Sequence, residues 1–137
     1  MDSVNTTIDN IHLATHLVYT AGNLAYRMRG QGLTIDTKTS ISDVVTQADR
    51  AAEEYVTSTL IQQRPDDSVL GEEGTLRLGE SGTRWTIDPV DGTYNFANNF
   101  EYWCSAIAFT ENDPTDPVRL RSRERYLSPS NTVTAGA

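Results

Sequence analysis

One segment of the chain, residues 85–96, places two carboxylates three residues apart around a proline and directly before a glycine and a threonine. Its apolar start predicts a strand that arrives from a core, and the proline after Asp88 is expected to stop sheet pairing there. Asp88 and Asp91 could then converge on one point. Two such carboxylates repel each other unless a cation lies between them, and oxygen-only ligands favour magnesium, manganese or calcium.

Length and charge limit the classes of protein to which the chain can belong. With 137 residues it is expected to form one domain, and 37% apolar residues are enough for a core. Its net charge of −8 argues against binding to nucleic acid or to an anionic membrane, both of which need basic patches. One cysteine excludes an internal disulfide, and no signal peptide or membrane-spanning run is found, so we expect a cytoplasmic protein.

Periodic patterns predict two helices followed by short strands. Apolar or small residues recur at steps of three and four over residues 6–29, and the glycines after that stretch are expected to end the first helix. A second helix is predicted over 43–63. The predicted strands are residues 68–71, 84–88 and 102–110.

Three acidic elements are candidates to meet in space. Glu72 and Glu73 follow one predicted strand, Asp88 and Asp91 follow the next, and Asp49 lies on the second helix. Loops at strand ends are where open α/β folds usually place their sites, so we expect these acids to gather at one pole of the sheet.

The residues after this acidic group are suited to a phosphate. Gly92 allows close approach of the backbone, and free N–H groups at a helix N-terminus bind anions. Metal ions neutralise the charge of a phosphate and activate water. A Thr–Asp pair could take the proton of that water, and Thr93 and Asp49 are the candidates.

These motifs together resemble the inositol monophosphatase family of magnesium-dependent, lithium-sensitive phosphomonoesterases. The resemblance is carried by residues 43–49, 71–73 and 88–96, in that order, and it covers roughly residues 5–113. It implies an α+β, layered α/β sandwich of the sugar-phosphatase type, with two N-terminal helices packed on an antiparallel sheet. It also implies Mg²⁺ as the cofactor, a small phosphorylated polyol or sugar as the ligand, and a possible homodimer.

The resemblance also implies a role for each matching residue. Glu72, Asp88, the Val90 carbonyl and Asp91 would bind metal, whereas Asp49 and Thr93 would activate water. Gly92, Thr93 and Asp91 would bind the phosphate. Glu73 is a possible further ligand, and Lys38 occupies a position near the substrate in a looser match.

The chain departs from the family in its C-terminal part. Family members are about twice as long, and the Trp-Asp motif of their second half, which completes the metal site, has no counterpart here. We therefore divide the chain into an inositol monophosphatase-like portion, residues 1–117, and an atypical tail, residues 118–137, that is truncated or disordered. An arginine-rich stretch in this tail could instead form a further strand of the sheet.

Two functions remain open after this comparison of motifs. The first is hydrolysis of a phosphate monoester, with myo-inositol 1-phosphate as the default substrate and histidinol phosphate or fructose 1,6-bisphosphate as alternatives. The second is a catalytically incomplete fragment that retains some metal or phosphate binding, or no activity.

Overall fold

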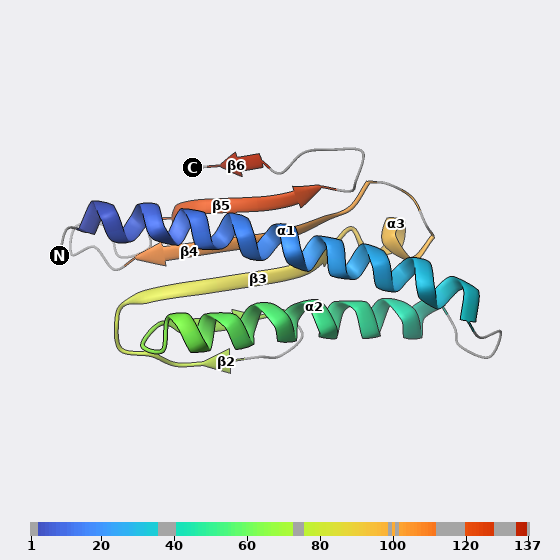
Figure 1. Cartoon of the computed structure of the whole chain (residues 1–137), viewed down its shortest axis with the longest axis horizontal. Helices are drawn as coiled ribbons and strands as arrows, with labels where there is room; N and C mark the ends of the chain where they lie inside the picture. Colours follow the sequence, from blue (N-terminus) through green and yellow to red (C-terminus); the bar gives the residue numbers. More distant parts are fainter. Residues whose placement is uncertain are drawn as a thin grey trace.

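Two long helices lie side by side across one face of a single sheet in the computed structural model (Figure 1). The structure describes residues 3–35, 41–72, 76–98, 100, 102–111, 120–127 and 134–136. Helix α1 comprises Ser3–Ile35 and helix α2 comprises Ile41–Gln63. The prediction that α1 ends at its glycines was wrong, because the helix continues for several residues beyond them. A glycine lowers helix propensity by about 1 kcal/mol relative to alanine but does not forbid the helical conformation.

The sheet has six strands in the order β2-β1-β3-β4-β5-β6. Their bounds are β1 Ser68–Gly71, β2 Leu76–Arg77, β3 Thr83–Asp91, β4 Cys104–Glu111, β5 Leu120–Leu127 and β6 Thr134–Gly136, and the short helix α3, Thr93–Ala97, lies between β3 and β4. The layered arrangement of helices on a sheet is confirmed. The sheet is mixed, however, because β1 and β3 pair in parallel while the other pairs are antiparallel.

Parallel pairing of β1 and β3 decides where the acidic residues lie. Since the two strands run in the same direction, their carboxyl ends reach the same edge of the sheet. Gly71 at the end of β1 is the register partner of Ile87, the residue before Asp88. Glu72 and Asp88 are therefore brought together by backbone pairing, and the Glu72 N–H donates a hydrogen bond to the Ile87 carbonyl oxygen (3.2 Å).

Strand β3 does not stop at Pro89, as the sequence analysis expected, but continues to Asp91. The register shifts within this stretch: Asp88 pairs with Ala106 and Asp91 pairs with Cys104. Pro89 and Val90 of β3 thus lie opposite the single residue Ser105 of β4, which is a bulge that accommodates the proline's missing N–H. Residues three apart on a regular strand point to opposite faces, so a bulge at this point allows both aspartates to serve one site.

The core lies between the helices and the sheet. The largest fully buried side chains include Trp85, Phe96, Phe109 and Leu17, which come from the strands, α3 and α1. The rings of Trp85 and Phe109, on neighbouring strands, are 5.0 Å apart between centroids. Fully burying such a side chain contributes about 1.5–3 kcal/mol, so this packing fixes β3 and β4 beneath the helices.

Residues 120–127, in the arginine-rich part of the tail, form β5, which pairs with β4 along most of its length. The sequence analysis had offered such a further strand as the alternative to a disordered tail. The division of the chain at residues 117 and 118 stays a prediction. None of the helices in the described ranges has the length and apolar character needed to span a membrane.

Candidate metal and phosphate site

Four carboxylates influence one another at the end of the sheet where β1 and β3 finish. Asp88 hydrogen-bonds to Glu72, and the charges of Glu72, Asp91 and Asp49 all act on it. Burial, followed by this hydrogen bond and these charges, raises the pKa of Asp88 from 3.8 to about 8. A carboxyl group with this pKa is mostly protonated near neutral pH when no cation is bound. Every influence on Asp88 therefore disfavours its negative charge, and no positively charged group among the described residues compensates for it.

The acids around Asp88 differ in their access to solvent. Asp49, on α2, is only 7% exposed, whereas Glu72 and Asp91 are exposed at the strand ends. The Oδ1 atom of Asp88 is buried and has no hydrogen-bond partner among the described residues. A buried oxygen without a partner is costly, and a cation ligand would satisfy it.

The donor set fits a hard cation in chemistry and charge, because every candidate ligand is an oxygen. The described residues do not, however, contain a group of three or more His, Cys, Asp or Glu side chains arranged to hold a metal ion. Glu73 and Lys38, the two looser predictions, lie outside the described residues. The structure thus brings Glu72 and Asp88 into direct contact and leaves the full ligand set as a prediction.

In the turn after β3, Gly92 has a backbone conformation that strongly favours glycine. Gly92 has a φ of 95° and precedes α3 as its N-terminal cap. A Cβ at this position would also lie 3.1 Å from the Tyr102 carbonyl oxygen and 3.3 Å from the Trp103 Cα. Both the positive φ and the close backbone approach exclude a side chain here without strain.

Thr93 follows this turn and is exposed. Its hydroxyl donates to the carbonyl oxygen of Val90, itself a predicted metal ligand, across 3.4 Å. Val90 is buried, with 4% of its surface exposed, so its carbonyl is fixed by packing of the side chain into the core. The predicted pairing of Thr93 with Asp49 through a water stays a prediction.

Sequence reasoning missed three residues that support the site. Ser105 is buried on β4 and donates to the Pro89 carbonyl oxygen, which holds the bulge. Glu53 is 4% exposed on α2, one turn after Asp49, and its carboxylate lies where a Cβ at Gly71 would be. Arg29 packs beneath α3. The spacing of four between Asp49 and Glu53 was a readable signal, since such residues share a helix face.

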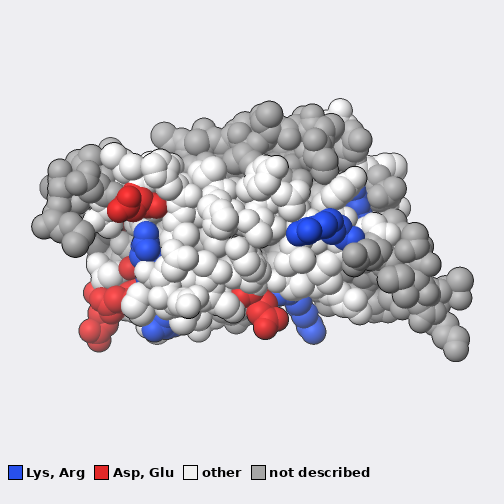
Figure 2. All heavy atoms as spheres, in the orientation of Figure 1, with Lys and Arg blue, Asp and Glu red and all other residues white. Residues whose placement is uncertain are grey.

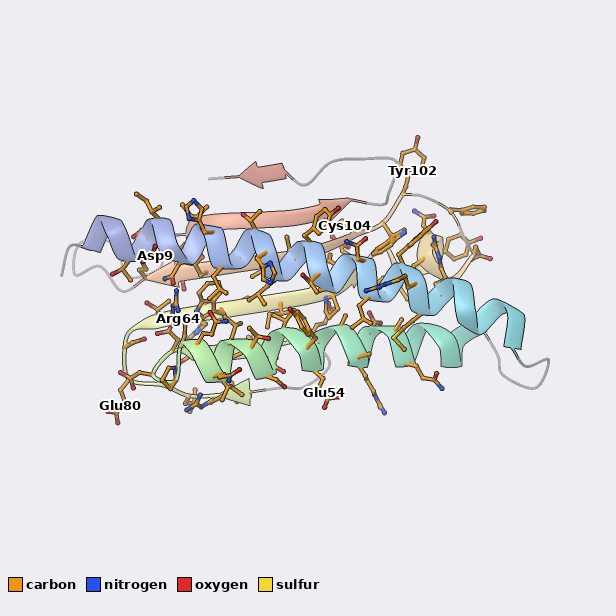
Figure 3. All side chains as sticks on the ribbon, viewed as in Figure 1. Asp9, Glu54, Arg64, Glu80, Tyr102 and Cys104 are labelled. Atoms are coloured by element: carbon orange, nitrogen blue, oxygen red, sulfur yellow. The ribbon has the colours of Figure 1, made fainter. Side chains whose placement is uncertain are left out.

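The single thiol also lies at this end of the molecule. Cys104 is half-buried, and its Sγ atom is 3.9 Å from Asp91 Oδ2. Figure 3 shows Cys104 toward the same end as Tyr102, away from Arg64 and Glu80 at the other end of the sheet. On the face drawn in Figure 2, the basic side chains of the described residues are scattered among acidic ones and form no continuous patch.

Comparison with known proteins gives the family of this chain. The model of the inositol monophosphatase family matches residues 9–115, and the chain belongs to that family. The histidinol-phosphatase of Mycobacterium tuberculosis is 42% identical over 104 residues, which are 75% of this chain and 40% of that protein. The inositol-1-monophosphatase of Synechocystis is 35% identical over 104 residues, again 75% of this chain but 36% of that protein.

Solved structures agree with the architecture. Inositol monophosphatase II of Staphylococcus aureus superposes with a TM-score of 0.77 at 25% identity, over 94% of this chain and 46% of that one. An inositol monophosphatase from Zymomonas mobilis gives 0.73 at 27% identity, over 100% and 49%. The chain therefore spans about half or less of the length of these relatives. The family to which it belongs is one of phosphomonoesterases.

Proposed function

We propose that this chain catalyses the Mg²⁺-dependent hydrolysis of a small sugar or polyol phosphate monoester. The observation that carries the proposal is the cluster of acids around Asp88, where burial, a hydrogen bond with Glu72 and the charges of the neighbouring carboxylates together raise the pKa of Asp88 to about 8. An acidic protein can bind an anionic phosphate at such a place only with a cation between them. Family membership supports the same chemistry.

In this proposal Glu72, Asp88, Asp91 and the Val90 carbonyl would hold Mg²⁺. The bound ion would neutralise the phosphate and make a water more acidic. The chain's own residues do the rest. Backbone N–H groups of Gly92 and Thr93 would orient the phosphate, because a turn in this conformation directs N–H groups toward an anion. Asp91 would act on the phosphate through the cation that it binds. Asp49 and Thr93 accept the proton of the attacking water.

The substrate follows from the relatives only as a choice between two classes. A relative at 42% identity and another at 38%, from Streptomyces coelicolor, are histidinol-phosphatases, while that of Synechocystis is an inositol-1-monophosphatase. We keep myo-inositol 1-phosphate as the default and test histidinol phosphate beside it, with fructose 1,6-bisphosphate as a third substrate.

A catalytically incomplete chain is the second candidate, and two observations favour it. The described residues hold no group of three potential metal-binding side chains, and the match covers only 40% of the histidinol-phosphatase of Mycobacterium tuberculosis. Such a chain would bind metal or phosphate without turnover.

Phosphate release by the folded chain distinguishes the two candidates. Purified protein is assayed with each substrate, with and without Mg²⁺, beside Asp88→Asn and the surface control Asp66→Asn. We expect release that requires Mg²⁺, is lost in Asp88→Asn and is retained in Asp66→Asn. No release from any substrate, in protein whose fold is shown by circular dichroism, would favour the incomplete chain.

A further inference from the structure

A buried arginine lies beneath the turn that is proposed to bind phosphate. Arg29 on α1 is only 5% exposed in a protein of net charge −8. Its guanidinium carbon is 5.5 Å from the ring centroid of Tyr26, 4.9 Å from that of Phe96 and 5.6 Å from that of Trp103. One guanidinium nitrogen also donates to the carbonyl oxygens of Phe96 (3.3 Å) and Phe100 (3.2 Å). Burial of so polar a side chain demands such a set of partners.

The two carbonyls belong to the segment that follows Gly92. Within it, the Phe96 N–H donates to the Gly92 carbonyl oxygen (3.0 Å), and the Asn95 side-chain amide donates to the Tyr102 carbonyl oxygen (2.8 Å). The segment thus folds back on itself and brings its end against its beginning, where the Trp103 backbone lies against Gly92.

Arg29 lies between the two ends of this fold. Phe96 and Trp103 contact each other edge to face, with centroids 4.9 Å apart, and the guanidinium packs against both rings. Since Phe96 is in α3 and Trp103 contacts Gly92, whatever holds these two rings also fixes where the turn lies. A planar guanidinium can stack on rings and donate in its plane at once, whereas an ammonium cannot.

We propose that Arg29 is a positioning residue for the Gly92–Thr93 turn and thereby for the phosphate group of the substrate. It acts through Phe96, Phe100 and Trp103 and does not itself touch the ligand. The link to phosphate rests on the proposed function; the link to the turn stands on the contacts alone.

Amide hydrogen exchange tests the link to the turn in the full chain. The variants are Arg29→Met and Arg29→Lys, and the matched control is Arg27→Met, because Arg27 is an exposed arginine on the same helix. We expect protection of the Phe96, Asn98 and Phe100 amides to fall about tenfold or more in both Arg29 variants, while β3 and β4 keep theirs. The control is expected to match the unmodified chain.

Two exchange results would overturn the proposal. Unchanged protection of these three amides would show that the turn does not depend on Arg29. An equal loss across β3 and β4 would show that Arg29 only stabilises the fold as a whole.

Titration with inorganic phosphate in the presence of Mg²⁺ tests the second link. We expect Arg29→Met to weaken phosphate binding at least severalfold and Arg27→Met to leave it unchanged. Unchanged affinity in Arg29→Met, despite local loss of protection, would overturn the link to phosphate. If the unmodified chain binds no phosphate, the proposed function fails, and hydrogen exchange still decides whether Arg29 positions the turn.

Discussion

Two aspartates near opposite ends of β3 face opposite situations. Asp67, just before β1, is 7% exposed and accepts hydrogen bonds from Ser81 Oγ (2.6 Å) and Trp85 Nε1 (2.9 Å). Asp88, near the other end of β3, is surrounded by three further acids, and one of its oxygens is buried without a hydrogen-bond partner in the described part of the chain.

The contrast separates a structural carboxylate from one prepared for a ligand. Both oxygens of Asp67 are satisfied by donors of the protein, so its burial ties the loop before β3 to the core. The environment of Asp88 instead disfavours its ionised form, which only a proton or a cation can relieve. The same residue type therefore stabilises the fold at one end and weakens it, in the absence of metal, at the other.

The largest change in the free energy of unfolding is expected when Asp67, the structural carboxylate, is replaced. Asp67→Ala leaves the Trp85 indole N–H buried without an acceptor, so we expect a loss of about 2–4 kcal/mol in the free energy of unfolding. Urea denaturation measures it, with the neighbouring Asp66→Asn as a control expected to change stability by less than about 0.5 kcal/mol. A loss in Asp67→Ala no larger than in the control would remove the structural half of the comparison.

A smaller change in stability, of opposite sign, is expected when Asp88 is replaced. Asp88→Asn removes an ionisable group whose charged form is disfavoured, so the metal-free chain should gain about 1 kcal/mol or more at neutral pH, since one pKa unit corresponds to about 1.4 kcal/mol. The measurement is the same urea titration in the presence of a chelator. A variant that is less stable than the unmodified chain would contradict this account of Asp88.

The pH dependence of stability gives the finest comparison. The pKa of Asp88 is about 8 in the folded chain and ordinary, near 3.8, when unfolded. Between these values the folded chain holds a proton that the unfolded chain has released, so stability falls as pH rises from about 4 to about 8. We expect this fall to be shallower in Asp88→Asn than in the unmodified, metal-free chain, by chemical denaturation at several pH values. Equal slopes would show that Asp88 does not titrate as described.

Much of this arrangement could be predicted from sequence because local patterns specify it. The strand over residues 68–71 has the predicted bounds, and the motif around Asp88 identified the strand end that carries the acids. The parallel pairing of β1 with β3 could not be predicted, because it depends on the path of the chain between them. The bulge at Pro89 was mistaken for a strand end, since a missing N–H has the same local signature in both.

The contacts of the residues that support the site could not be predicted either, because their partners are distant in the sequence. Arg29 is only two residues from exposed Arg27, but its spacing of four from buried Ala25 places it on the buried face of α1. What it contacts there, Phe96 and Trp103, depends on long-range packing. Ser105 shows no local signal, because its partner, the Pro89 carbonyl, is on the neighbouring strand.

Calorimetric titration of the folded, metal-free chain with Mg²⁺ tests the central claim most directly, namely that the acids around Asp88 form a cation site. We predict saturable binding that is lost in Asp88→Asn, weakened in Glu72→Gln and retained in Asp66→Asn. Absence of saturable binding in the unmodified chain, or equal binding in Asp88→Asn, would contradict it.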